Sequence, residues 1–564
     1  MNFKEMKYVR PDMDKLTPEV KALIEKFENA EKVDDQVEVI EKLNDIKIEF
    51  GSMRTLAFIN YSINTSDEKF QEEQDYFDDN FPQYGELMSG FYKALAESRF
   101  RPELEQKYGK QFFNIAEMTT KTVSPEVIDD LVKENHLGSK YLKIIASANI
   151  PFDGKMLNLQ EFKPYMETLD RETREKAHEA YWSFFEENGE ELDKLYDDLV
   201  KVRDTIAKKL GYKNFVELAY MRMERSDYNA DDVKKFRDYI KKYVVPVSVK
   251  LRDMQRERLG LDTLKYSDLP IYFKNGNAAP KGEPQWIVDK GRKMYDELSP
   301  KTGEFFSFMI DNNLMDLYSR KGKADMGYCD FIPKYKSPFI FANMNGTEYD
   351  ITVLTHEAGH AFQAYSSAHF PIKEYFDTTS EAAEIHSMSM EFLTWPWMEL
   401  FFEENTDKFK FSHMSGSILF LPYGCLVDEF QHYVYENVNA TPEERRMKWL
   451  ELEREYIPFI DYTGIKPLKD GRRWQKQGHI YEMPFYYIDY CLAQICAFQF
   501  WKKAEANREE ALEDYIKLCA AGGSQSFLDL VKYANLASPF EEDTVKSMVG
   551  EVEGWLNEVE HLQL

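Results

Sequence analysis

Two histidines and a glutamate occur together in the segment Thr355-His-Glu-Ala-Gly-His360. On an α-helix, residues four apart lie on the same face, so His356 and His360 can present both imidazoles to one metal ion. Glu357 projects about 100° around the helix from His356, where it can reach a metal-bound water without being a ligand. Two histidine ligands with a glutamate as general base are typical of zinc-dependent peptide hydrolysis.

The residues around this motif predict the helix that must position it. Apolar side chains before and after the motif, such as Leu354 and Phe362, favour a buried helix over a strand. Asn345-Gly346 is a turn signal. Thr347 with Asp350 three residues later fits a capping box, which predicts a helix start about two turns before the histidines.

A catalytic zinc needs a third protein ligand and one open position. The downstream residues with suitable side chains are Glu374, Asp377, Glu381, Glu384, His386 and Glu391. Thr378-Thr-Ser-Glu381 fits a second capping box, which gives Glu381 a role at a helix start. Glu384 lies one turn further in, and we predict it as the third zinc ligand.

Two other residues of the same segment receive different predictions. Glu391 lies two turns beyond Glu384 on the same helix face, and we predict that it bonds the outer nitrogen of a ligating histidine, with a solvated charge as the alternative. His386 points about 200° away from Glu384 on an ideal helix, so we predict that it faces the substrate or packs, and not that it binds metal.

The stretch from Phe339 to His360, followed by the segment with Glu384, resembles the thimet oligopeptidase and oligoendopeptidase F family of zinc metallopeptidases. Within that family it is most similar to bacterial Pz-peptidase-like oligoendopeptidases. The resemblance is strong from about residue 321 to the end and weak before residue 200. The family's third ligand is a glutamate about two dozen residues beyond the second histidine, with another glutamate seven residues later; Glu384 and Glu391 match both.

The resemblance implies a mainly α-helical, two-lobed body around a deep channel, with a small β-sheet whose edge strand lies beside the zinc site. It implies an endopeptidase that holds one Zn²⁺ per chain and cuts short, unstructured oligopeptides, collagen-derived peptides among them. In the expected mechanism, Glu357 takes a proton from the zinc-bound water, the hydroxide attacks the scissile carbonyl, and Glu357 passes the proton to the leaving amine.

A short apolar strand is predicted just before the zinc helix. It comprises residues 339–344 and is preceded by Pro333 and Pro338, which favours an edge position. An edge strand beside the zinc can hydrogen-bond an extended peptide. The resemblance implies this arrangement, with the backbones of Ala342 and Met344 as the predicted substrate contacts.

A second group of residues follows near the C-terminus. Peptide hydrolysis gains from a hydrogen-bond donor aimed at the oxygen that becomes negative in the transition state. His479, Tyr487 and Tyr490 can supply such donors, and in the resembling family a histidine and two tyrosines of this region bind substrate and stabilise the transition state. Tyr486 remains an alternative counterpart, with substrate binding as its predicted role. A late Gly522-Gly523 pair is predicted to allow close backbone approach to the channel.

Length and patterning set the organisation of the chain. Its 564 residues are expected to form an N-terminal helical lobe over residues 1–200 and a zinc-binding catalytic region over residues 201–564. Amphipathic helices are predicted over residues 16–27 and 33–50, with a break near Pro82.

Charge and cysteine content exclude several classes of protein. The formal net charge of −28, from 72 basic and 100 acidic residues, argues against nucleic acid and anionic membranes as partners. Five irregularly spaced cysteines fit free thiols in a reducing compartment. There is no signal-peptide pattern and no run of about 18 apolar residues, so the protein is expected to be cytoplasmic. The oligomeric state does not follow from the sequence.

Two alternatives to an endopeptidase use the same motif. One is a noncatalytic, zinc-containing peptide-binding scaffold; the absence of cysteine near the motif argues against it, because structural zinc sites fill all four positions and usually use cysteine. The other is a zinc exopeptidase. An end-blocked peptide distinguishes the two enzymes, because an endopeptidase cuts such a peptide and a strict exopeptidase cannot. We interpret His369, His413 and His432 as structural residues.

Overall fold

The computed structural model describes residues 1–320, 322–324, 326–559 and 564, and the described chain is predominantly helical, with two small sheets. The predicted mainly α fold is therefore confirmed. The N-terminal third contains α1 (Met13–Glu28), α2 (Val33–Ile63), α3 (Glu68–Ala96), α4 (Arg101–Tyr108), α5 (Lys110–Thr119), α6 (Ile128–Ala146), β1 (Ile150–Phe152), β2 (Lys155–Leu157), α7 (Lys163–Met166) and α8 (Arg171–Glu187). None of the helices in the described part of the chain combines the length and apolar composition that a membrane crossing requires.

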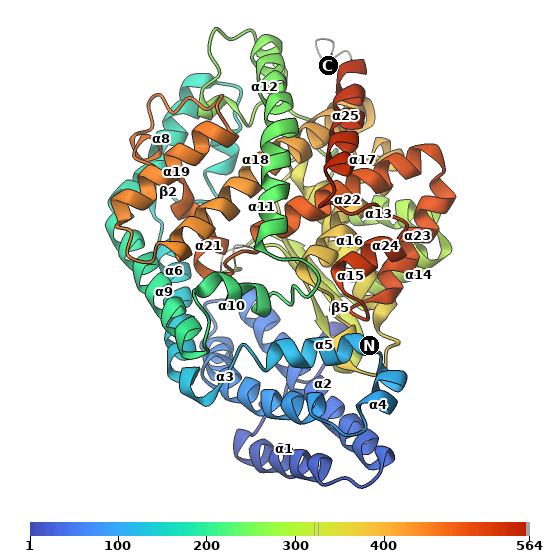
Figure 1. Cartoon of the computed structure of the whole chain (residues 1–564). Helices are drawn as coiled ribbons and strands as arrows, with labels where there is room; N and C mark the ends of the chain where they lie inside the picture. Colours follow the sequence, from blue (N-terminus) through green and yellow to red (C-terminus); the bar gives the residue numbers. More distant parts are fainter. Residues whose placement is uncertain (321, 325, 560–563) are drawn as a thin grey trace.

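The middle of the chain brings the second sheet and the helices around it. Its elements are α9 (Gly189–Lys209), α10 (Phe215–Arg222), α11 (Ala230–Tyr239), α12 (Val245–Leu259), α13 (Pro284–Leu298), α14 (Pro300–Asp311), β3 (Met315–Tyr318), β4 (Tyr328–Ile332), β5 (Ser337–Met344), α15 (Tyr349–Ser367) and α16 (Ser380–Leu393). Figure 1 shows the blue helices α1–α5 at the bottom of the molecule, next to β5 and α15.

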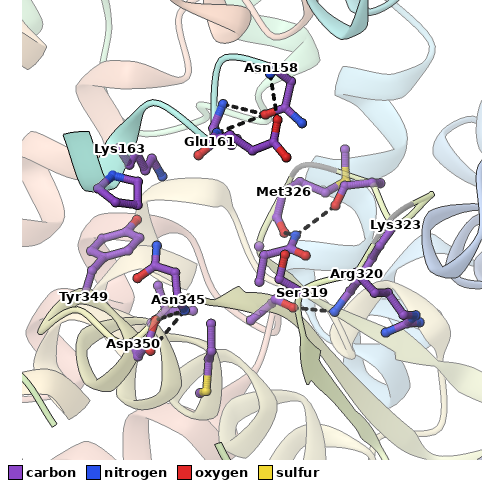
Figure 2. A pocket seen from close by; sticks show the side chains of 18 of the residues that line it. Asn158, Glu161, Lys163, Ser319, Arg320, Lys323, Met326, Asn345, Tyr349 and Asp350 are labelled. Atoms are coloured by element: carbon purple, nitrogen blue, oxygen red, sulfur yellow. Dashed lines mark hydrogen bonds between the residues drawn. The ribbon is translucent and has the colours of Figure 1, made fainter. Parts of the chain in front are cut away.

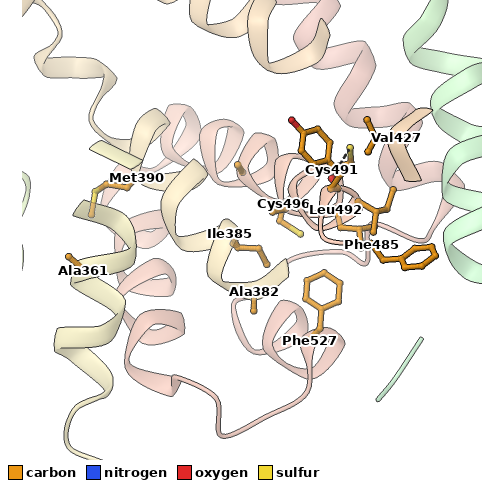
Figure 3. Close-up of a cluster of buried hydrophobic side chains, with 14 of the residues drawn as sticks. Ala361, Ala382, Ile385, Met390, Val427, Phe485, Cys491, Leu492, Cys496 and Phe527 are labelled. Atoms are coloured by element: carbon orange, nitrogen blue, oxygen red, sulfur yellow. Dashed lines mark hydrogen bonds between the residues drawn. The ribbon is translucent and has the colours of Figure 1, made fainter. Parts of the chain in front are cut away.

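The C-terminal elements complete the body around α16. They are α17 (Glu399–Phe402), α18 (Thr406–Glu436), α19 (Pro442–Tyr456), α20 (Lys466–Lys469), α21 (Gly478–Glu482), α22 (Tyr487–Ala506), α23 (Arg508–Ala521), α24 (Phe527–Tyr533) and α25 (Glu542–Glu558). Helix α16 packs against both α15 and α22. Figure 3 shows Ala382 and Ile385 of α16 against Leu492 and Cys496 of α22 in an apolar cluster. The helix that carries Glu384 is thus fixed from two sides.

The predicted break at Pro82 is wrong. Helix α3 runs through this proline, which is buried. A proline removes one backbone hydrogen bond and can kink a helix. Here Leu87, Met88 and Phe91 are buried on the same helix, and their packing holds it as one element.

The three-stranded sheet corrects the predicted position of the strand over residues 339–344. The strand order is β3-β5-β4, with β5 parallel to β3 and antiparallel to β4, so β5 is central. Pro333 lies in the turn between β4 and β5, and Pro338 pairs with Phe331 at the start of the ladder. The two prolines therefore mark a turn and not an edge; the edge strand on the side of the metal motif is β4.

Helices α15 and α16 approach each other closely at Gly359. A Cβ atom at this position would lie 2.5 Å from the backbone oxygen of His386 and 2.7 Å from the Cα atom of Ser387. Both distances are shorter than carbon contacts allow, so only glycine permits this spacing. The contact sets the distance between the helix with the two histidines and the helix with Glu384.

A buried ion pair joins the N-terminal helices to the segment before α16. Lys47 of α2 pairs with Glu374, and the two side chains are only 4% and 6% exposed. The hydroxyl of Tyr92 in α3 donates a hydrogen bond to Glu374, and the Lys47 ammonium lies 5.4–5.6 Å from the ring centres of Phe91, Tyr92 and Phe112. The charge pair therefore connects α2 and α3 to a segment that is about 280 or more residues away in sequence.

Lys47→Met is expected to lower the free energy of unfolding by about 3–5 kcal/mol, because Glu374 is left as a buried, unpaired carboxylate. Urea denaturation at pH 7 measures the change. Lys47→Met combined with Glu374→Gln is expected to recover part of the loss, since the double variant buries no unpaired charge. Equal losses in the single and double variants would contradict this explanation.

Candidate metal centre

Three side chains predicted as zinc ligands converge in the structure. One ligand atom each of His356, His360 and Glu384 lies within 4.8 Å of the others. The Oε2 atom of Glu384 is 3.3 Å from Nε2 of His356 and 3.6 Å from Nε2 of His360. Atoms bound about 2.0–2.2 Å from a tetrahedral zinc are about 3.3–3.6 Å apart. The donor types and their spacing therefore fit a tetrahedral zinc ion.

The protonation of Glu384 also suits a ligand. Burial alone would raise the pKa of Glu384, but the two histidines and the hydroxyl of Tyr486 lower it to about 2. The carboxyl group is therefore ionised at neutral pH. Its two oxygens have different neighbours: Oε2 faces the histidines and accepts a hydrogen bond from Ser387 Oγ, whereas Oε1 accepts one from Tyr486.

Glu391 lies behind the histidines. Its Oε1 atom is 2.7 Å from Nδ1 of His356, and its Oε2 atom is 2.7 Å from Nε2 of His413. The indole N–H of Trp395 donates to Nδ1 of His413, so the proton of His413 resides on Nε2 and is donated to Glu391. Burial would raise the pKa of Glu391, but the hydrogen bonds from both histidines lower it. An ionised Glu391 thus orients His356 with Nε2 toward the candidate metal position.

His413, like Ser387 and Trp395, belongs to this centre although the sequence does not predict it there. The sequence indicates a structural role for His413, which lies on α18, far from the motif in sequence. No local spacing connects it with His356, since their link passes through Glu391 of a third helix. A histidine within an apolar helical stretch was the only available signal, and such histidines usually pack in a core.

Glu357 is positioned as expected for a group that acts on a bound molecule. It is 7% exposed, and within the described residues its Oε2 atom has no hydrogen-bond partner. Burial and, more weakly, the carboxylates of Glu384 and Glu391 raise the pKa of Glu357 to about 7. Glu357 is not one of the three converging ligand residues.

Two pockets meet at Glu357 and Gly327, which line both. The first, of about 300 Å³, is bounded by Tyr328 to Phe331 of the edge strand β4 and by the three ligand residues. The second is larger, at about 820 Å³. Together they form a groove that passes the metal centre along the edge of the sheet.

The larger pocket extends along the first turns of α15. Figure 2 shows Lys163 and Tyr349 on one side and Arg320 and Lys323 on the other. Ala342 and Met344 contribute to its lining. The β4–β5 ladder ends at the pair Tyr328–Phe341, so residues 342–344 lack a β4 partner although β5 is a central strand. The carbonyl of Ala342 already accepts a hydrogen bond from Lys323.

The aromatic residues predicted to act on the transition state form one cluster. The ring centre of His479 is 5.6 Å from that of Tyr486, 5.0 Å from Tyr487 and 6.1 Å from Tyr490. Tyr486 and Tyr490 line the metal pocket, whereas Tyr487 is 9% exposed and packs beside Phe420. Burial lowers the pKa of His479, so its ring is neutral at pH 7 and retains one N–H donor.

His386 does not reach the groove. It is fully buried, lines neither of the two pockets, and packs where Gly359 meets α16. The prediction that it contacts substrate is therefore not supported by its position, and its alternative role, packing, agrees with the structure. The backbone of Leu518 in α23 lies beside the imidazole of His386, and the hydroxyl of Tyr515 in the same helix donates a hydrogen bond to its carbonyl oxygen, so His386 lies against α23.

Neither predicted capping box forms. Helix α15 begins at Tyr349, and Asp350 accepts hydrogen bonds from the backbone N–H groups of Asn345 and Gly346 instead of pairing with Thr347. Helix α16 begins at Ser380 without a side-chain cap. Glu381, expected at the cap, is fully buried, and neither of its oxygens has a partner among the residues described.

Glu381→Gln is expected to stabilise the protein at pH 8 and to have little effect near pH 4.5. Burial, and secondarily the carboxylate of Asp489, raises the pKa of Glu381 from 4.5 to about 8. The folded state therefore holds this proton more tightly than the unfolded state, and the free energy of unfolding falls as the pH rises from about 4.5 to about 8. Urea denaturation across this range measures the effect; parallel pH profiles for both proteins would contradict it.

Comparison with known families places the whole site in matched segments. Residues 3–123 match the peptidase M3 N-terminal domain, and residues 164–281 and 296–550 match peptidase family M3. The chain is 52% identical to Pz peptidase A, solved with an inhibitor, with a TM-score of 0.98 and coverage of 100% of both chains. It is 51% identical to a Bacillus anthracis protein assigned as oligoendopeptidase F, with a TM-score of 0.93 and coverage of 100% of this chain and 99% of that one.

Curated relatives are more distant. An oligoendopeptidase F homologue from Borreliella burgdorferi is 22% identical over 65% of this chain and 62% of its own length. Oligoendopeptidase F from Lactococcus lactis subsp. cremoris is 23% identical over 70% of this chain and 65% of its own length. The matched region thus spans slightly less than two thirds of the length of each of these relatives.

Proposed function

Because the chain belongs to peptidase family M3, we propose that it is a zinc-dependent endopeptidase that hydrolyses internal bonds of short oligopeptides. The family membership confirms the resemblance noted in the sequence and identifies a peptide hydrolase. The observation that carries the finer proposal is the convergence of His356, His360 and Glu384 within 4.8 Å of one another, with Glu357 beside them at the junction of two pockets.

The proposed chemistry assigns one role to each group. His356, His360 and Glu384 would hold the ion, which when bound supplies Lewis acidity toward water and a peptide carbonyl. Glu357 accepts a proton from the attacking water and returns it to the nitrogen of the leaving amine. Its raised pKa, close to the working pH, suits both steps. Glu391 and His413 keep His356 in the required orientation.

Substrate binding is proposed along the edge strand. An extended peptide can pair with the free edge of β4 in the smaller pocket and continue past Ala342 and Met344 in the larger one. Tyr490, which lines the metal pocket, would donate a hydrogen bond to the carbonyl oxygen that gains negative charge, with His479 or Tyr487 as alternative donors. We propose short, unstructured peptides as substrates, collagen-derived ones included, because a single extended chain fits a recessed edge.

The five cysteines form no disulfide, which agrees with a cytoplasmic location.

An end-blocked, quenched peptide of about ten residues tests the proposal. The protein is expected to cut it internally, to lose this activity on treatment with a chelator, and to regain it when zinc is added. Mass spectrometry of the products locates the cut. If the protein cuts a peptide with free ends but not the blocked one, it is an exopeptidase. If it binds zinc but cuts neither peptide, it is a noncatalytic scaffold.

A further inference from the structure

The chain takes an unusual turn at Phe485, immediately before helix α22. Phe485 has φ = +69°, the left-handed region that residues with a Cβ rarely adopt, and its side chain is fully buried. Such a conformation costs on the order of 1–2 kcal/mol and persists only where the surroundings hold it. Strained residues of this kind cluster at functional sites.

Two side chains from other parts of the molecule hold the turn. The N–H of Phe485 donates to Oε1 of Gln431 at 2.9 Å, and its carbonyl accepts from Nη2 of Arg225 at 2.7 Å. The amide of Gln431 is itself fixed, since its Nε2 donates to the carbonyl of Val427 on the same helix, α18. Both polar groups of the Phe485 backbone are thus satisfied by buried side chains.

Arg225 also fixes the start of α22. Its guanidinium pairs with Asp489 in the first turn of that helix, with Nη2 2.6 Å from Oδ1, and both side chains are fully buried. The guanidinium lies 4.5 Å from the ring centre of Tyr220. Arg225 therefore bonds the turn and the helix that follows it, and it keeps their relative geometry constant.

The residue between the turn and the helix is Tyr486, whose hydroxyl donates to Oε1 of Glu384 at 2.7 Å. The other oxygen, Oε2, faces His356 and His360. A hydrogen bond to the oxygen on the far side of a ligating carboxylate restricts its rotation, and partners of this kind typically change metal affinity 10–100-fold. Tyr486 is therefore placed to orient Glu384, which differs from the substrate contact predicted for it.

We propose that Gln431 and Arg225 hold the left-handed turn at Phe485 so that Tyr486 orients Glu384 for metal binding. Two residues that touch neither metal nor substrate thereby set the metal affinity of the site. The inference rests on the proposed zinc centre. Arg225, Gln431 and Phe485 are positioning residues that act through Tyr486.

The test compares Phe485→Ala with Phe485→Gly. Both remove the buried ring, but only glycine adopts positive φ without cost. Zinc affinity is measured by competition with a chromophoric chelator, starting from metal-free protein. Phe485→Ala is expected to bind zinc more weakly than Phe485→Gly, by up to about fivefold, because a cost of about 1 kcal/mol limits the difference. Equal affinities of the two variants would overturn the role of the turn.

A second variant tests whether the turn acts through Tyr486. Tyr486→Phe removes only the hydroxyl and is expected to bind zinc about tenfold more weakly than wild type. In the Tyr486→Phe background, the difference between alanine and glycine at position 485 is expected to disappear. A difference that persists there would overturn the pathway through Tyr486, because independent effects add.

Gln431→Met serves if the Phe485 variants do not fold, as circular dichroism would show. It removes the acceptor for the Phe485 N–H with little change in volume, and its effect on zinc affinity should likewise vanish when Tyr486 is phenylalanine. An undiminished effect in that background would overturn the proposal. Failure of the wild-type protein to bind zinc would instead refute the metal centre itself.

Discussion

Glu357→Gln is expected to lower kcat on an end-blocked peptide by about 10²–10⁴-fold while leaving metal binding intact. Glutamine has nearly the same shape as glutamate but cannot accept the proton of the attacking water. Glu357 is outside the converging ligand set, and its Oε2 atom bonds no side chain in the described structure, so the substitution leaves His356, His360 and Glu384 in place. Steady-state kinetics together with metal analysis of the purified protein measure both effects.

Glu381→Gln is the matched control. It makes the same chemical change in a buried glutamate three residues from Glu384, outside both pockets. We expect it to retain activity close to wild type, so that loss in Glu357→Gln cannot be attributed to replacing any buried carboxyl group by an amide. If Glu357→Gln cuts the peptide as fast as wild type, another group accepts the proton and the assignment of Glu357 fails.

Gly359→Ala is expected to weaken zinc binding by about 10–100-fold and to reduce the free energy of unfolding by about 1–3 kcal/mol. The added methyl group meets the backbone of His386 and Ser387, which cannot rotate away as a side chain can. Helix α16 must therefore move away from α15. Glu384 lies on α16 and both histidines lie on α15, so this movement increases the ligand separations.

Gly550→Ala in α25 is the control for Gly359→Ala. A Cβ at Gly550 would meet no atom within 4 Å, so alanine there should raise helix stability by up to about 1 kcal/mol. Zinc titration and urea denaturation of both variants measure zinc affinity and the free energy of unfolding. The comparison separates the effect of the close α15–α16 contact from the effect of alanine on helix propensity. Unchanged zinc affinity in Gly359→Ala would show that α16 carries Glu384 independently of this contact.

The sequence was sufficient to predict which side chains lie close together where this depends on local spacing. His356, His360 and Glu357 follow from one turn of helix, and Glu384 and Glu391 follow from helix periodicity and the family resemblance. Features that depend on contacts between distant segments of the chain could not be predicted from the sequence. The link from Glu391 to His413 joins two helices, and the order of strands in the sheet depends on β3, which pairs with β5 across an intervening segment.

Glycines illustrate the same limit. The sequence predicts that Gly522 and Gly523 allow close backbone approach to the substrate channel. In the structure, a Cβ at Gly522 would lie 2.2 Å from the carbonyl oxygen of Tyr375, and one at Gly523 would lie 2.1 Å from that of Asp377. These glycines permit close backbone packing against the segment that leads into α16. A sequence shows that a glycine is present but not which neighbour requires it.

The recessed position of β4 has a consequence for aggregation. A sheet edge with free backbone groups is normally a template on which other chains assemble into larger sheets. Strand β4 has five residues and lines a pocket between its own sheet and α15 and α16. A single extended strand can enter this recess, whereas the edge of a second sheet brings neighbouring strands that meet the helices first. The geometry that admits a peptide thus also keeps two molecules from joining edge to edge through β4.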